Sequence, residues 1–277
     1  MISDFTPGRA AVLAPGVRRL VAPNPGMMTG PGTNTYLVGE DEVAVIDPGP
    51  RIEAHIDAIQ AQSPGRIRWI LCTHTHPDHS PAAMPLAGAT GAELLGIPAP
   101  AGKVQDKSFD PNRVLADGDT LVTGEFVLRA VHTPGHASNH LCFRHEMHRW
   151  LFTGDHIMNG STVVIDPPDG NMKHYLESLE RLKTLELAAL APGHGDVIER
   201  PLNAIDWLIG HRLKREAKVV SALETHPGLT LTELTPHVYS EVDPGLHSLA
   251  SRSLLAHLGK LEIENRAVCV DERWSAN

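Results

Sequence analysis

Short apolar runs separated by turns dominate the first two hundred residues of the chain. Six segments each begin with an apolar run that predicts a strand: residues 34–39, 42–49, 66–73, 126–136, 148–157 and 187–195. Apolar residues at helical spacing predict a helix over residues 51–62, and a second helix is expected to begin within residues 77–87. Strands that alternate with helices predict a layered α/β fold.

The last third of the chain is expected to be mostly helical. The predicted elements are helices at residues 171–187, 201–224, 229–239 and 246–265, followed by a strand or β-wing at residues 266–274. We therefore predict two domains, residues 1–210 and residues 211–277, of which the second is a small, winged-helix-like appendage.

Residues with metal-binding side chains follow four of the predicted strands. They are the cluster His74, His76, Asp78 and His79 after the strand at 66–73, and then His136, Asp155 and His194, each on the loop after a later strand. Ligands of layered α/β folds bind beyond the carboxyl ends of the strands. The pattern therefore predicts one site that several loops assemble.

The seven side chains are of the kinds that borderline divalent metals prefer. His74 and His76 can bend toward one ion, whereas Asp78 and His79 can face a second. Each pair is two ligands short of a tetrahedral zinc site, and the loop residues would supply the rest. We expect two metal ions, zinc foremost, although Mn²⁺ and Fe can share the same ligands.

Composition and charge narrow the classes of partner. The chain has 24 Lys and Arg against 33 Asp and Glu, a formal charge of −9. This mild acidity gives no reason to expect nucleic acid or a membrane as partner. No signal peptide or membrane span is evident, and the three cysteines lack CxxC spacing, so they read as buried free thiols. The expected location is the cytoplasm.

The order of these motifs resembles the metallo-β-lactamase-fold hydrolases, and most of all the β-lactamase-like protein 2 subgroup. The stretches that carry the resemblance are GPGTNTYLVG, THTHPDHSPAA, TPGHASNHLCF, LFTGDHIMNGST, LAPGHG and the C-terminal HRLKREAKVVSAL with SLLAHLGKLE. The resemblance covers nearly the whole chain. It implies a four-layer αββα metallo-β-lactamase fold with a C-terminal winged-helix extension.

The resemblance also implies a role for each ligand. His74, His76 and His136 would bind the first metal, Asp78, His79 and His194 the second, and Asp155 would bridge the two. A hydroxide between the metals would attack the substrate, and Asp78 would orient it and pass a proton to the leaving group. Asp47 would hydrogen-bond a ligand histidine from outside the metal shell.

Other candidate residues have an equally simple structural interpretation. His140 could stabilise an oxyanion as a catalytic residue, or it could be a structural histidine. His156 directly follows Asp155 and is expected to point away from the site. Cys72 lies within an apolar strand and reads as a packing residue.

Several reactions remain open at this stage. The first hypothesis is hydrolysis of a small ester, thioester or lactone-type substrate. The alternative is a metal-dependent endoribonuclease that acts on single-stranded RNA, which the resembled subgroup includes. β-Lactam hydrolysis and a mononuclear iron dioxygenase are weaker alternatives. A non-enzymatic DNA-binding module disagrees with the complete ligand set.

The charge of the C-terminal region bears on the choice of partner. From His211 onward the chain has 8 Lys and Arg against 9 Asp and Glu, and the predicted recognition helix offers only Arg252 and Lys260. A winged helix that reads nucleic acid usually carries a more basic helix. We therefore expect a small-molecule substrate and a C-terminal domain that packs or dimerises, with RNA as the remaining alternative and no membrane partner.

Overall fold

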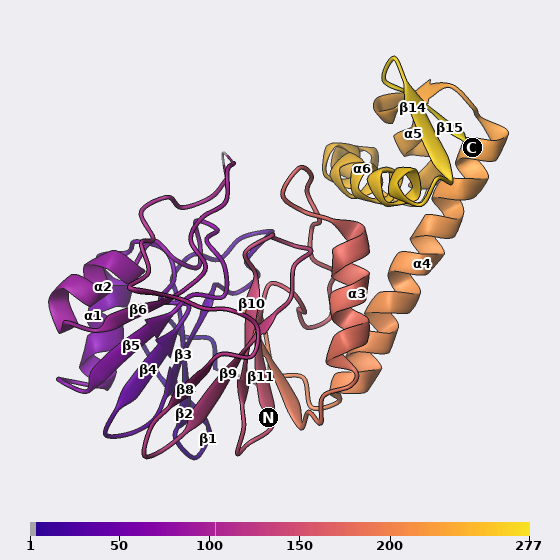
Figure 1. The fold of residues 1–277 in the computed structure, drawn as a ribbon. Helices are drawn as coiled ribbons and strands as arrows, with labels where there is room; N and C mark the ends of the chain where they lie inside the picture. Colours follow the sequence, from indigo (N-terminus) through magenta and orange to yellow (C-terminus); the bar gives the residue numbers. More distant parts are fainter. Residues whose placement is uncertain (1–3, 103) are drawn as a thin grey trace. The chain divides into compact units, whose positions relative to one another are not determined.

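The computed structural model describes residues 4–102 and 104–277. By its internal contacts the chain divides into two compact units (Figure 1). The first unit contains residues up to 133, residues 139–161 and residues 186–201, and the second contains residues 134–138, 162–185 and 202–277.

The first unit is built on two β-sheets. The larger sheet has seven strands in sequence order: β1 (Ala11–Ala14), β2 (Val17–Val21), β3 (Asn34–Val38), β4 (Val43–Ile46), β5 (Ile67–Leu71), β6 (Glu93–Gly96) and β7 (Arg113–Val114). Strands β1 to β4 are antiparallel to their neighbours, whereas β4 to β7 run parallel. The parallel part brings the carboxyl ends of its strands to one edge of the sheet.

The second sheet has five strands. In spatial order they are β12 (Ala189–Pro192), β11 (Trp150–Gly154), β10 (Leu141–His145), β9 (Val127–His132) and β8 (Thr120–Val122). Only the β11–β12 pair is parallel. The loops after β9, β11 and β12 carry His136, Asp155 and His194, as the sequence predicts.

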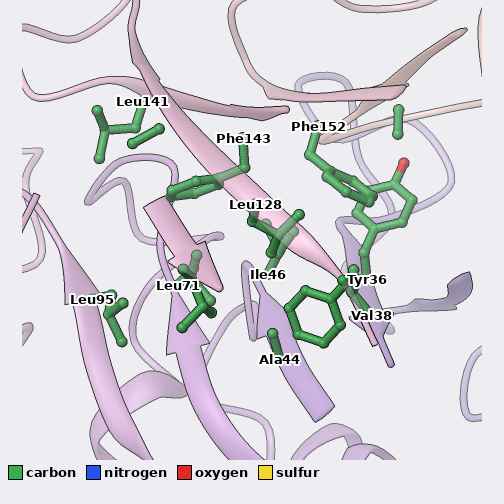
Figure 2. Close-up of a cluster of buried hydrophobic side chains, with 14 of the residues drawn as sticks. Tyr36, Val38, Ala44, Ile46, Leu71, Leu95, Leu128, Leu141, Phe143 and Phe152 are labelled. Carbon is green, nitrogen blue, oxygen red and sulfur yellow. The ribbon is translucent and has the colours of Figure 1, made fainter. Parts of the chain in front are cut away.

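Apolar side chains from both sheets meet in one core (Figure 2). The larger sheet contributes Tyr36, Ile46 and Leu71, and the smaller sheet contributes Phe143 and Phe152. The rings of Tyr36 and Phe152 lie 5.0 Å apart, centroid to centroid. This packing of sheet on sheet fixes the strand ends that carry the candidate ligands.

The other face of the larger sheet is covered by two helices, α1 (Glu53–Gln62) and α2 (Ala83–Thr90) (Figure 1). Leu37 and Val45 point to this face while Tyr36 and Ile46 point to the inner core, the alternation expected of strands. The first unit thus contains an α-layer and two β-layers of the predicted four-layer fold.

The second unit is largely helical. Its elements are α3 (Met172–Leu182), α4 (Pro201–Thr225), β13 (Leu229–Thr230), α5 (Leu231–Val238), the 3₁₀ turn η1 (Pro244–Leu246), α6 (His247–Ile263), β14 (Ala267–Val270) and β15 (Arg273–Ala276). The three strands form a small sheet in the order β13-β15-β14, and a separate apolar core joins α4, α5, α6 and this sheet. The predicted boundary between residues 210 and 211 lies within α4 and stays a prediction.

The structure adds two features that the sequence patterns did not specify. Helix α2 begins at Ala83, well inside the segment at 77–87, because Pro81 disfavours helical dihedrals at Ser80. Asp78 and His79 therefore lie in a turn before the helix. The β1–β2 hairpin was not predicted, although Pro15 and Gly16 form a tight turn, with Gly16 at a φ of 69°.

The three cysteines, all of which the structure describes, form no disulfide. Cys72 and Cys142 are buried as predicted, but Cys269 on β14 is only half-buried. Among the described residues, no helix is both long and apolar enough to cross a membrane.

Candidate metal centre

The histidine-rich loop begins where β5 ends. Because β4 and β5 are parallel, Asp47 at the end of β4 lies beside this loop. His74 and His79 are fully buried, whereas the Asp78 side chain keeps 26% of its surface exposed. The imidazole rings of His74 and His79 are 4.2 Å apart, centroid to centroid. The loop therefore places its polar groups together at the edge of the sheet.

The structure brings three imidazoles into a first group that could hold a metal ion. His74, His76 and His136 each offer a ligand atom, and these atoms lie within 4.8 Å of one another. Nε2 of His74 is 3.0 Å from Nδ1 of His76. His136 lies on the eight-residue loop, residues 133–140, that joins β9 to β10. Its Nδ1 donates to the carbonyl of Val164 at 2.7 Å. This hydrogen bond leaves Nε2 as the ring nitrogen that could bind a metal.

Hydrogen bonds around Thr73 determine the tautomer of His74. The Thr73 hydroxyl donates its single proton to Oδ2 of Asp47 at 2.7 Å. It can therefore only accept from Nδ1 of His74, which is 3.0 Å away. Nδ1 of His74 carries the proton, and the lone pair of Nε2 points toward His76. This is the arrangement that a metal-ligating histidine needs.

Four other side chains form a second group. Asp78, His79, Asp155 and His194 each offer an atom within 4.8 Å of the others. Nε2 of His194 is 3.2 Å from both the Asp78 and the Asp155 carboxylate, and Nε2 of His79 is 3.5 and 3.3 Å from the same two groups. All seven predicted ligands thus fall into one of the two groups.

The spacing within the second group fits a metal ion. Ligand atoms about 2.0–2.1 Å from one ion at tetrahedral angles lie roughly 3.3 Å apart, and the four distances above bracket that value. Nε2 of His79 and Nε2 of His194 are buried but make no well-aligned hydrogen bond, although both face the carboxylates. Buried polar atoms rarely stay in that state without a further partner such as an ion.

Asp47 holds this arrangement from outside. Its Oδ1 accepts from the Thr73 amide at 2.7 Å, and its Oδ2 accepts from Nδ1 of His79 at 2.9 Å as well as from the Thr73 hydroxyl. The backbone of Asp47 lies in the left-handed region, with a φ of 51°. Such dihedrals concentrate at functional sites. The expected hydrogen bond between Asp47 and a histidine of the cluster is observed at His79, whose role as a metal ligand stays a prediction.

Charge is balanced within the second group through shifted pKa values. Burial lowers the pKa of His194, but the Asp155 and Asp78 carboxylates outweigh it and raise the value to about 9. Burial likewise opposes charge on His79, yet Asp78, Asp155 and Asp47 raise its pKa well above the usual range. Both shifts favour the doubly protonated, charged form of the two imidazoles in the metal-free protein. A metal ion must therefore displace these protons when it binds.

The second group is packed so tightly that Gly193 has no room for a side chain. A Cβ there would lie 2.7 Å from Cε1 of His79 and 2.8 Å from Oδ1 of Asp155. The backbone at Gly193 therefore approaches the second group as closely as only a glycine allows.

The two weaker candidates among the histidines lie beside the site. His140 is fully buried, its ring stacks on His74 at 5.0 Å, and its Nδ1 lies 2.9 Å from the Thr133 hydroxyl. This burial favours the structural role for His140 over the catalytic one, which stays a prediction. His156 is also fully buried, with its ring 5.7 Å from that of His140, and it belongs to neither group.

Sequence reasoning missed the residues that support the ligand loop. Thr73, which joins Asp47 to His74, was not singled out. Neither was Gln105, whose side chain accepts from the Thr75 hydroxyl at 2.6 Å. Asp106 accepts from the Ser80 hydroxyl at 2.6 Å. A hydroxyl next to a ligand histidine is a usable sequence signal, whereas the pairing with residues 105 and 106 is long-range.

Comparison with known families agrees with this geometry. Residues 28–194 match the family described as the metallo-beta-lactamase superfamily, more than half of the chain. The chain belongs to the metallo-beta-lactamase superfamily. Residues 230–274 match the beta-lactamase associated winged helix domain. The predicted fold class and the predicted family are both confirmed.

Individual relatives cover most of the chain. It is 31% identical over 268 residues to the beta-lactamase-like protein 2 homolog of Drosophila melanogaster. The aligned region covers 92% of this chain and 90% of that protein. It is 33% identical over 218 residues to the atrochrysone carboxyl ACP thioesterase of Aspergillus fumigatus, with 77% and 66% covered. These relatives and the family confirm that the chain is a metal-dependent hydrolase.

A solved structure shows the same fold. The beta-lactamase domain protein from Burkholderia ambifaria superimposes with a TM-score of 0.83 at 22% identity, covering 99% of this chain and 96% of that one. At this identity the likeness concerns the fold alone.

Proposed function

We propose that this chain is a dinuclear metal hydrolase that cleaves the ester, thioester or lactone bond of a small-molecule substrate. The observation that supports it most is the convergence of two adjoining ligand groups from four strand-end loops. We assign three imidazoles to the first metal and Asp78, His79 and His194 to the second, with Asp155 as the bridge. The three imidazoles are those of His74, His76 and His136.

Zinc is the metal that we propose for both positions. Imidazole and carboxylate ligands suit borderline divalent ions, and the interatomic spacing of the second group agrees with a tetrahedral site. Manganese and iron accept the same ligand types and are the alternatives that an elemental analysis separates.

The residues of the site divide the work of hydrolysis. When bound, the metal pair would lower the pKa of a water molecule to about 7 and polarise the carbonyl oxygen of the substrate. Asp78 is the more exposed carboxylate, with 26% of its side chain accessible against 13% for Asp155. It is therefore the group that can take a proton and return it to the leaving group. Asp47 and Thr73 hold His79 and His74 in the ligating tautomers.

The thioester class is favoured by the relatives. One is named a carboxyl ACP thioesterase and another is named Thioesterase pkgB, at 33% and 34% identity. The net charge of −9 agrees with a substrate that is not a polyanion.

The C-terminal winged helix supports the same choice over RNA. Of the two cations that the sequence places on α6, Arg252 pairs with Asp166, and Lys260 is buried against Glu216 at 2.7 Å. Cations engaged within the protein are poorly placed to bind phosphates. We propose that this domain packs or dimerises, and we keep the cytoplasm as its expected location.

A substrate panel tests the proposal. The purified, zinc-loaded protein would be assayed against aryl esters, acyl thioesters, lactones, a β-lactam and a single-stranded RNA oligomer. We expect acyl-bond cleavage that a chelator abolishes and zinc restores, and a fall of about 10²–10⁴-fold in kcat for Asp78→Ala. Asp57→Ala, which changes an exposed carboxylate on α1, is the control. RNA cleavage without acyl-bond cleavage, or oxygen uptake with iron, would overturn the assignment.

A further inference from the structure

The loop segment that carries His136, residues 134–138, belongs to the second unit and is held by other residues of that unit. Gly135 accepts a hydrogen bond from the Asn171 amide at 2.8 Å, and Pro134 accepts one from the Ser178 hydroxyl at 2.8 Å. A Cβ on Gly135 would lie 2.4 Å from Cα of Tyr175, so the loop lies directly against α3. The backbone of the loop is therefore fixed by α3, while the ring of His136 is oriented by the carbonyl of Val164.

The segment that provides this carbonyl is itself anchored by the C-terminal helices. Arg212 on α4 donates from Nη2 to the carbonyl of Val163, the residue directly before Val164. Arg252 on α6 forms an ion pair with Asp166, two residues after Val164. Two cations from two different helices thus hold a stretch of four residues.

Arg212 is buried in the interior of the second unit. The residue is 3% exposed, and its guanidinium lies over the ring of Tyr175 at 5.4 Å. Tyr175 is the residue whose backbone contacts Gly135. Arg212 is therefore connected to the loop of His136 in two ways, through Val163 and through Tyr175. Burial of a guanidinium costs free energy unless hydrogen bonds satisfy its N–H donors.

We propose that Arg212 is a positioning residue for the metal ligand His136. By fixing Val163, it places the carbonyl of Val164 so that Nδ1 of His136 stays protonated and Nε2 faces the metal. Arg252 supports the same segment from its other side. The winged-helix unit would then act as a brace for one metal ligand, a role that requires no nucleic acid. The inference rests on the proposed two-metal site.

Arg215 offers a matched control three residues further along α4. Its guanidinium also covers a tyrosine ring, that of Tyr239 at 4.1 Å, and also donates to a backbone carbonyl, that of Val238 at 2.8 Å. Arg212 and Arg215 thus share two kinds of contact in the same unit, and Arg215 in addition forms an ion pair with Glu241 at 2.8 Å. Of these two arginines, Arg212 is the one that hydrogen-bonds the segment that orients His136.

The test measures zinc affinity with a competing chelator, in full-length wild type, Arg212→Met, Arg212→Lys, Arg252→Met and Arg215→Met. We expect the affinity for one of two ions to fall about 10–100-fold in Arg212→Met, with partial recovery in Arg212→Lys. Arg252→Met should weaken the same ion to a smaller degree, and Arg215→Met should bind as the wild type does. Nitrogen NMR of the His136 ring should show loss of the pure Nδ1–H tautomer in Arg212→Met.

The outcomes separate this inference from the proposed function. A wild type that binds no zinc overturns the proposed function. Two ions in the wild type with unchanged affinity in Arg212→Met, or equal losses in Arg212→Met and Arg215→Met, overturn only the role of Arg212. If Arg212→Met does not fold, Arg252→Met decides, because its ion pair is 41% exposed on the arginine side and its loss is tolerated more easily. Unchanged zinc affinity in Arg252→Met then overturns the inference.

Discussion

At the scale of single residues, the candidate site depends on hydrogen bonds that orient the ligands. Asp47 accepts from Thr73 and His79, and the Thr73 hydroxyl accepts in turn from His74. One carboxylate thereby sets the tautomer of an imidazole in each of the two groups. Backbone carbonyls orient two further imidazoles: the carbonyl of Val164 accepts from Nδ1 of His136, and the carbonyl of Gly32 accepts from Nδ1 of His194 at 3.2 Å.

Replacement of Thr73 by Val tests this chain of hydrogen bonds. Val keeps the shape of the side chain but removes the hydroxyl that ties Asp47 to His74. We expect a loss of about 10–100-fold in metal affinity, with about 1–3 kcal/mol of destabilisation from the buried groups that lose a partner. Thr73→Ser keeps the hydroxyl and should bind metal nearly as well as the wild type. Equal affinity in Thr73→Val would exclude the role of this hydroxyl.

The raised pKa of His194 predicts a pH dependence of the metal-free protein. A folded-state pKa of about 9 against the ordinary value of 6.5 means that the folded protein holds this proton more tightly. The contribution of this proton to the free energy of unfolding is complete below pH 6.5 and is lost as the pH rises through 9. It amounts to roughly 3 kcal/mol in all. Urea unfolding of the chelated protein should therefore show falling stability over this range.

His194→Gln isolates the effect, because the raised pKa values of His79 and of buried Cys72 also make the free energy of unfolding fall as the pH rises. The variant should be less stable than the wild type at pH 6.5 and should approach it at pH 9. A constant difference between the two proteins across this range would contradict the assignment.

At the scale of elements, the sequence predicts the site better than it predicts the elements around it. The strand ends could be found because a buried strand is a near-continuous apolar run and a polar ligand directly follows it. The start of α2 at Ala83 falls within the predicted segment 77–87, and Pro81 keeps Asp78 and His79 outside the helix. The supports at Val164 and Gln105 could not be predicted, because each joins segments 28 to 30 residues apart through contacts that leave no periodic pattern.

The tight loop after β12 yields a prediction at this scale. Gly193→Ala should displace His79 or Asp155, because the added Cβ would come within 2.8 Å of both. We expect weakened metal binding in a protein that still folds, measured by zinc titration and circular dichroism. Gly88→Ala in α2, where nothing lies within 4 Å of the added Cβ, should bind metal normally and gain about 0.5–1 kcal/mol. Normal zinc binding by Gly193→Ala would show that the close packing is not required.

At the scale of the whole molecule, the chain is a metallo-beta-lactamase-fold hydrolase with an added winged-helix domain. The two have separate apolar cores, one between the two large sheets and one among α4, α5 and α6. The fold class, the family and the grouping of all seven ligands follow from sequence motifs. The substrate does not, because it depends on loop shapes that no spacing of residues determines.

The central claim is that the two groups each bind one ion. Elemental analysis of the wild type, His136→Ala and His194→Ala, purified and then dialysed against zinc and metal-free buffer, tests it most directly. We predict about two zinc ions per chain in the wild type and about one in each variant, because each histidine belongs to a different group. A wild type with a single ion that both variants lose, or one with none, would contradict the account.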